Sequence, residues 1–134
     1  MTSELRVDNL KGSTTGGSIN VLGEGTSATT NLQQGLAKGW VQFDTNDNPP
    51  VADGSFNVAS LTDDTAEIEI NLTSAMNDAL FSPVSSGANS VSNPANRNVS
   101  CGCVSSSVIN TEVYTTANSQ DTGLNHVTWH GDLA

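Results

Sequence analysis

The chain has 134 residues and a mass of 13.8 kDa, the length of one ordinary domain. Apolar residues make up 35% of it, below the roughly 45 to 50% usual for globular domains, so any core is lean. The formal net charge of −10 disfavours nucleic-acid binding, which depends on Lys and Arg displacing counterions from phosphates.

The charges are divided unevenly along the chain. Residues 1–38 are neutral, with three basic and three acidic side chains. Residues 39–134 contain 11 acids against Arg97 alone, so their net charge is 1 − 11 = −10. The whole excess of negative charge therefore belongs to the second part of the chain, where we interpret it as a solvated surface.

The first residues, MTSELRVDNL, lack the basic and apolar regions of a secretory signal. No window approaches the roughly 18 consecutive apolar residues of a membrane span. We therefore expect a chain that folds in a cytoplasm without membrane insertion. Cys101 and Cys103 are one residue apart and poorly placed to bridge each other, so they do not indicate a disulfide framework.

Two short extended pieces flank the Gly-rich stretch KGSTTGG near the amino terminus. Leu5 and Val7 alternate with polar neighbours in the first, as do Ile19 and Val21 in the second. Neither piece can bury its apolar side locally, so we predict that residues 1–37 form an extended oligomerisation or attachment arm. The alternative is a terminus without fixed structure. The residues expected to make contacts between chains are Leu5, Val7, Leu10, Ile19, Val21 and Leu22.

From residue 38 onward, the pattern predicts short strands. AEIEINL alternates strictly between apolar and polar residues, as in an antiparallel sheet with one solvated side. KGWVQFD and GSFNVASL show shorter alternations, and the turn-forming stretch DTNDNPPVADG between them predicts a hairpin-like connection. The predicted core comprises Val41, Phe43, Phe56, Val58, Ile68, Ile70 and Leu72.

Further strands are predicted in LFSPV, SVINTEVYTT and HVTWHG, whereas residues 82–106 read as long loops or a short edge strand. The predicted fold is all-β. It comprises an extended N-terminal arm followed, over residues 38–134, by a small antiparallel β-sandwich with a jelly-roll order as one option.

Signals for catalysis are weak. There is no nucleophile-elbow motif, and His126 and His130 are the only histidine bases. Glu67 and Glu69 form a carboxylate pair, but the alternation of AEIEINL puts them on the solvated side of a strand. We expect a protein without enzymatic activity and without a cofactor.

No metal site is predicted either. Asp44, Asn46 and Asn48 have the spacing of calcium ligands, but Pro49 occupies the position where a helix-loop-helix calcium loop needs Gly. A calcium ion bound at the surface of a β-loop is the alternative left open. The pair Cys101 and Cys103 leaves open a soft-metal site around the axis of a trimer, against the alternative of ordinary thiols.

Trp40, Trp129 and Tyr114 are the large aromatic residues that could stack on a sugar. Trp40 lies opposite Val41 and Phe43 in its strand pattern. Because both tryptophans fall within strand patterns, we nevertheless expect their rings to fill the core.

Several segments resemble structural proteins of marine tailed bacteriophages, especially those of cyanobacterial and related ocean hosts. The most specific segments are GLAKGWVQF and SFNVASLTDD, and the resemblance covers about residues 3–78 and 127–134. Such proteins usually carry a Gly-rich turn after the TDD element, where this chain has Thr65 and Ala66, and residues 82–122 match no pattern of the family.

The resemblance implies a homotrimer located in the virion and made in the host cytoplasm, with a threaded amino-terminal part and a β-sandwich head. A tail-fibre-like appendage contacting the host surface is the first functional expectation. The alternatives are a capsid decoration protein and a glycan-binding module. The implied partners are further copies of the chain, other tail or capsid proteins, and a host-surface glycan.

Overall fold

The computed structural model describes residues 4–13, 19–22, 29–64, 67–88, 98–114 and 123–134. The chain divides into two compact units, residues 1–36 and residues 37–134, and each is described here on its own. We call them the arm and the head. The division falls one residue before the boundary predicted from the sequence.

The arm contains little regular structure. Strand β1 (Asn20–Leu22) pairs antiparallel with β2 (Thr29–Asn31), which leads into a single helical turn, α1 (Leu32–Gly35). The side chain of Asn31 accepts a hydrogen bond from the backbone N–H of Gln33 at 2.9 Å and so caps this turn. Residues 4–13 contain no helix or strand. Among the described residues of the chain, no helix is long and apolar enough to cross a membrane.

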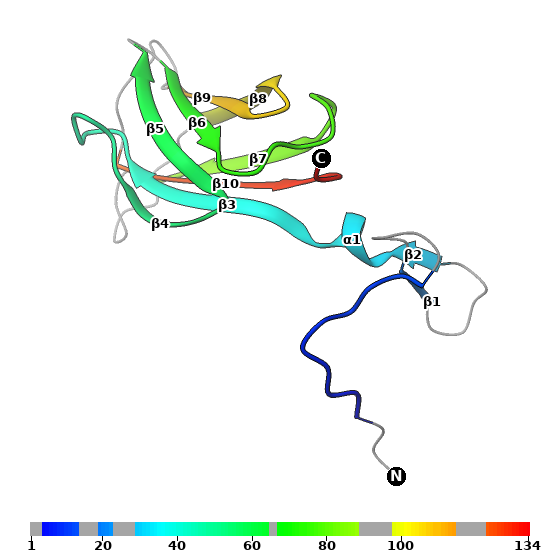
Figure 1. Cartoon of the computed structure of the whole chain (residues 1–134). Helices are drawn as coiled ribbons and strands as arrows, with labels where there is room; N and C mark the ends of the chain where they lie inside the picture. The colour runs from blue at the N-terminus through cyan, green and yellow to red at the C-terminus, as the bar shows by residue number, and fades with distance from the viewer. Residues whose placement is uncertain (1–3, 14–18, 23–28, 65–66, 89–97, 115–122) are drawn as a thin grey trace. The chain divides into compact units, whose positions relative to one another are not determined.

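The head is built from two four-stranded antiparallel sheets, which lie one over the other in Figure 1. The first sheet has the order β4-β3-β10-β7, with strands Ala52–Phe56, Ala37–Asp44, Leu124–His130 and Ser82–Gly87. The second has the order β5-β6-β9-β8, with strands Val58–Asp64, Glu67–Leu72, Val108–Tyr114 and Asn98–Ser105. The predicted all-β class is confirmed, and the arrangement is sandwich-like.

Strand order shows how the chain connects these sheets. β3 and β4 are paired as the predicted hairpin, and β5–β6 and β8–β9 are further pairs of consecutive strands. The order is not that of a jelly roll, in which most consecutive strands belong to opposite sheets. The alternation of β6 is confirmed, because Ile68, Ile70 and Leu72 are buried while the residues between them are partly exposed.

A single residue, Asn57, carries the chain from the first sheet into the second. It follows β4 and precedes β5, and its φ of 62° lies in the left-handed region that Asn tolerates better than most residues. Its side chain donates to the carbonyl oxygens of Lys38 and Ser74 at 3.0 and 3.2 Å and accepts from the Ser74 N–H at 2.7 Å. These bonds connect the corner to β3 of the first sheet and to the segment that follows β6 of the second sheet.

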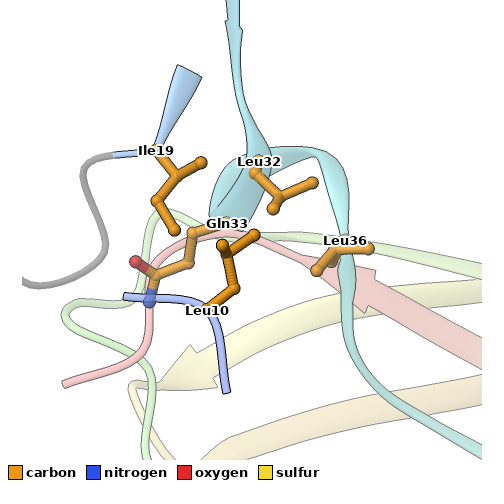
Figure 2. A pocket seen from close by; sticks show the side chains of 5 residues that line it. All are labelled: Leu10, Ile19, Leu32, Gln33 and Leu36. Atoms are coloured by element: carbon orange, nitrogen blue, oxygen red, sulfur yellow. The ribbon is translucent and has the colours of Figure 1, made fainter. Parts of the chain in front are cut away.

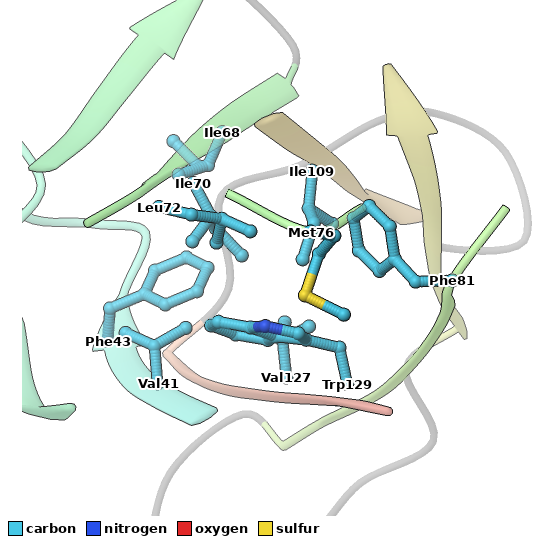
Figure 3. Close-up of a cluster of buried hydrophobic side chains, with 10 residues drawn as sticks. All are labelled: Val41, Phe43, Ile68, Ile70, Leu72, Met76, Phe81, Ile109, Val127 and Trp129. Carbon is cyan, nitrogen blue, oxygen red and sulfur yellow. The ribbon is translucent and has the colours of Figure 1, made fainter. Parts of the chain in front are cut away.

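One hydrophobic core fills the space between the sheets, and Figure 3 shows its side chains converging from both. Trp129, Phe43 and Ile70 are among its largest fully buried members. Val58 packs against this core in a partly buried position. The complete buried cluster is Val41, Phe43, Ile68, Ile70, Leu72, Met76, Phe81, Ile109, Val127 and Trp129.

The prediction that Phe56 belongs to the core is wrong, because its side chain is 56% exposed. The sequence pattern treated GSFNVASL as one strand, in which Phe56 and Val58 would share a face. The turn at Asn57 interrupts that alternation and separates the two residues into different sheets. Phe56 is the register partner of Trp40 and shares the outer side of the first sheet with it.

The prediction of loops or a short edge strand over residues 82–106 is also wrong in part. Two regular strands occupy most of this range, β7 with six residues and β8 with eight. Each lies at an edge of its sheet, as anticipated. The low apolar content of this range did not indicate strands. An edge strand nevertheless forms backbone hydrogen bonds with one neighbouring strand, whatever side chains it carries. Residues 89–97 lie outside the described part of the chain.

Candidate functional site

The arm leaves its apolar side chains in solvent. No side chain in its described residues is buried, and Leu5 is 75% exposed. Ile19 is partly buried. The other residues predicted to make contacts between chains are all 49 to 64% exposed: Val7, Leu10, Val21 and Leu22.

Part of this apolar surface is gathered around an open pocket of about 290 Å³. Figure 2 shows Leu10, Ile19, Leu32 and Leu36 around this hollow, with Gln33 beside them. The hydrogen bond from the Leu32 N–H to the Ile19 carbonyl, at 2.7 Å, holds two of these residues together. The pocket is a cluster of aliphatic side chains that the described residues of the arm leave open on one side.

The head exposes a second apolar surface, on the outer side of its first sheet. Register pairing places Phe56, Trp40, Thr128 and Val84 in one row across all four strands. Phe56, Trp40 and Val84 are 56%, 43% and 62% exposed. The adjacent row contains no Asp, Glu, Lys or Arg. We call the two rows together the uncharged face: Phe56, Trp40, Thr128, Val84, Gly54, Gln42, His126 and Ser86.

The outer side of the second sheet has the opposite character. Asp64, Glu67 and Glu112 are register partners in one row across β5, β6 and β9. The adjacent row contains Glu69 between two polar residues, and Asn110 from that row donates a hydrogen bond to Glu67. We call this surface the acidic face: Asp64, Glu67, Glu112, Thr62, Glu69 and Asn110.

The two cysteines pack inward from β8. Both are free thiols in partly buried positions against the hydrophobic core. Cys103 donates to the Phe81 carbonyl oxygen at 3.1 Å. Burial, and secondarily the neighbouring Cys101, raises the pKa of Cys103 and so favours the protonated thiol over the thiolate that binds soft metals. These observations favour ordinary thiols.

The other candidate chemical groups do not converge. Glu67 and Glu69 stand on the acidic face, while His126 and His130 lie four residues apart along β10. Asp44 uses a carboxylate oxygen to accept from the backbone and side-chain nitrogens of Asn46, at 2.8 and 2.7 Å. Within the described residues, no group of three or more His, Cys, Asp or Glu is placed to hold a metal ion.

The two tryptophans have different environments, and the prediction that Trp40 fills the core is wrong. Trp129 is fully buried, whereas Trp40 projects from the opposite side of β3 to Val41 and Phe43. A Cβ built on Gly54 would lie 3.3 Å from Cη2 and Cζ3 of Trp40, so the ring lies over this glycine. The alternation of KGWVQFD already contained this signal. The side chain of Tyr114 lies outside the described residues.

A shallow groove of about 250 Å³ adjoins Phe56 at the end of the first sheet. Lys38 lines it and is buried, with 5% of its surface exposed. Burial lowers the pKa of Lys38, and the nearby Asp132 carboxylate opposes that shift. The remaining lining residues are Asn57, Thr73, Ser74 and Leu133.

Comparison with protein-family models, curated proteins and solved structures gave no significant match to this chain.

Proposed function

We propose that this protein is a non-enzymatic structural protein of a phage virion, of the tail-fibre type, that assembles as a homotrimer. Its arm joins the copies to one another and to the particle, and its acidic head faces outward. The resemblance of GLAKGWVQF and SFNVASLTDD to virion proteins of marine tailed phages supports this proposal.

The observation that carries the proposal is the contrast between the exposed apolar arm and the closed head. Leu5, Leu10 and Leu22 are each more than half exposed in a segment whose net charge is only 2 − 3 = −1. Burying such side chains is favourable by roughly 1.5 to 3 kcal/mol each. An interface between copies of the arm is a direct way to remove this surface from water.

The mass of the full-length chain in solution tests the assembly. We expect light scattering to give about 41 kDa, which is three times 13.8 kDa. Replacement of both Leu10 and Ile19 by Ser should lower the mass toward that of one chain. A single-chain mass for the unaltered protein would contradict the proposal.

The location on the particle needs a separate experiment. Labelling of purified virions with an antibody against the head should mark the tail appendages. Labelling spread over the capsid shell would instead support a decoration protein, and absence of the chain from purified virions would reject both structural functions.

A further inference from the structure

The uncharged face is unusual for the head that carries it. The head contains 11 acidic residues and two basic residues, Arg97 and Lys38, of which Lys38 is buried. Yet two adjacent rows across its first sheet contain no Asp, Glu, Lys or Arg. A contiguous exposed apolar patch surrounded by charged surface is typical of an interaction site.

The shape of the patch favours a broad protein partner. Its apolar residues stand at both edges of the sheet, with Phe56 on β4 and Val84 on β7, and Trp40 lies between them on β3. The Trp40 ring lies over Gly54, which keeps it close to the sheet. A surface with this composition, an aromatic centre and few charges, resembles the core of protein interfaces.

Electrostatics allows that partner to be another copy of this chain. Two heads that approached through their acidic faces would bring Asp64, Glu67 and Glu112 of each copy together, and close like charges cost several kcal/mol. The uncharged face avoids this repulsion. It is therefore the broad head surface on which another copy with the same large negative charge can pack closely.

We propose that the uncharged face is the contact surface between heads, and that its occupant is a second copy of this chain. Phe56, Trp40 and Val84 become buried in that contact. The inference rests on the proposed assembly of the chain, but it uses residues of the head and none of the arm. It gives the assembly a second interface, formed by the first sheet.

Site-specific photo-cross-linking tests the contact in the full-length protein. Benzoylphenylalanine in place of Val84 should yield covalent dimers or trimers on a denaturing gel. The matched control has the same group in place of Thr62, an exposed residue of the acidic face that also lies on an edge strand. Equal cross-linking at both positions would overturn the inference, as would its absence at position 84 in a chain that light scattering shows to be trimeric.

Tryptophan fluorescence supplies an independent measurement. Trp129 is fully buried, so acrylamide quenching of the native protein reports chiefly on Trp40. We expect quenching to decrease as the protein concentration is raised through assembly. Undiminished quenching in the trimer would overturn the inference. If a neutral hexasaccharide of glucose protects Trp40 while assembly does not, the face binds a saccharide and the inference is wrong.

A pair of substitutions separates this inference from the role of the arm. Phe56→Ser should raise the dissociation constant of the assembly at least about tenfold, as the loss of an aromatic anchor does. Val104→Ser, at a side chain of nearly equal exposure in the second sheet, should leave it unchanged. If the Leu10 and Ile19 variant abolishes assembly while Phe56→Ser does not, the arm contact stands and the head contact fails. The reverse result retains the head contact and rejects the arm contact.

Discussion

Similar apolar side chains are exposed in the arm and buried in the head. Ile70 in the head is fully buried between two sheets, whereas Leu10 in the arm is 57% exposed beside an open pocket. The difference follows from how many layers each unit has. A hairpin of three-residue strands and one helical turn cannot enclose an apolar side chain, while two four-stranded sheets can.

The charges follow the same division. The arm, residues 1–36, has a net charge of 2 − 3 = −1, while the head, residues 37–134, has a net charge of 2 − 11 = −9. Within the head, two outer rows of the first sheet contain no Asp, Glu, Lys or Arg, whereas the corresponding rows of the second contain Asp64, Glu67, Glu69 and Glu112. Among the described residues, exposed apolar side chains gather in the arm and on the uncharged face, and both groups are explained if copies of the chain meet there.

The largest expected change in the free energy of unfolding distinguishes a buried side chain of the head from an exposed side chain of the arm. Ile70→Ala should lower the free energy of unfolding of the head by about 4 kcal/mol, because it removes a fully buried side chain and leaves a cavity. Leu10→Ala should change that free energy by less than about 0.5 kcal/mol. Denaturant titrations at low protein concentration measure both. Comparable losses would show that the arm contributes to the stability of the head.

The second prediction concerns how tightly the head is packed around Trp129. A Cβ on Gly39 would lie 2.0 Å from Cζ2 of this ring and 2.8 Å from the Phe56 carbonyl oxygen, so Gly39→Ala should destabilise the head by about 3 kcal/mol. Gly102→Ala is the control, because no atom lies within 4 Å of its added Cβ. Thermal unfolding compares the two. A small effect at Gly39 would mean that the ring can move aside.

The corner between the sheets should show an intermediate effect. Asn57→Ala removes the side-chain hydrogen bonds and keeps a Cβ at a positive φ, so we expect a loss of about 3 kcal/mol. Asn57→Gly loses the same bonds but tolerates this φ, and should cost about 1 kcal/mol less. Equal losses in chemical denaturation would indicate that backbone strain at this position is unimportant.

The smallest expected effect is a pair of opposite dependences on pH. Burial raises the pKa of Cys103, so its contribution to stability is complete below the unfolded pKa near 9.0 and falls as the pH rises through the folded value. Burial lowers the pKa of Lys38, so its cost is complete below the folded pKa and diminishes as the pH rises toward 10.5. In alkaline solution, the free energy of unfolding of the Cys103→Ala variant should therefore rise more with pH than that of the unaltered protein. The free energy of unfolding of Lys38→Met should rise less. Identical slopes would contradict both assignments.

Local patterns in the sequence predicted much of the head. The strict alternation in β6 identified Ile68, Ile70 and Leu72, and the turn-forming residues before β4 identified the hairpin with β3. Exposed apolar residues of the arm were also recognised, since no nearby residue could cover them. These features depend on neighbours within a few positions, where periodicity and turn chemistry act directly.

The uncharged face could not be predicted from local sequence patterns. Its rows join residues from four strands, and their alignment depends on the pairing of β10 between β3 and β7. Phe56 is the clearest case, since one residue at a positive φ determines on which side of the first sheet it lies.

The sequence by itself determined the all-β class, the periodicity of the strands and the separation of a nearly neutral arm from an acidic head, because these are properties of composition and short-range order. Only the tertiary structure decided that Phe56 lies outside the core and that Phe56, Trp40 and Val84 form one surface. The physical reason is that a side chain's burial depends on which sheet covers it, and that covering layer comes from residues distant in the chain.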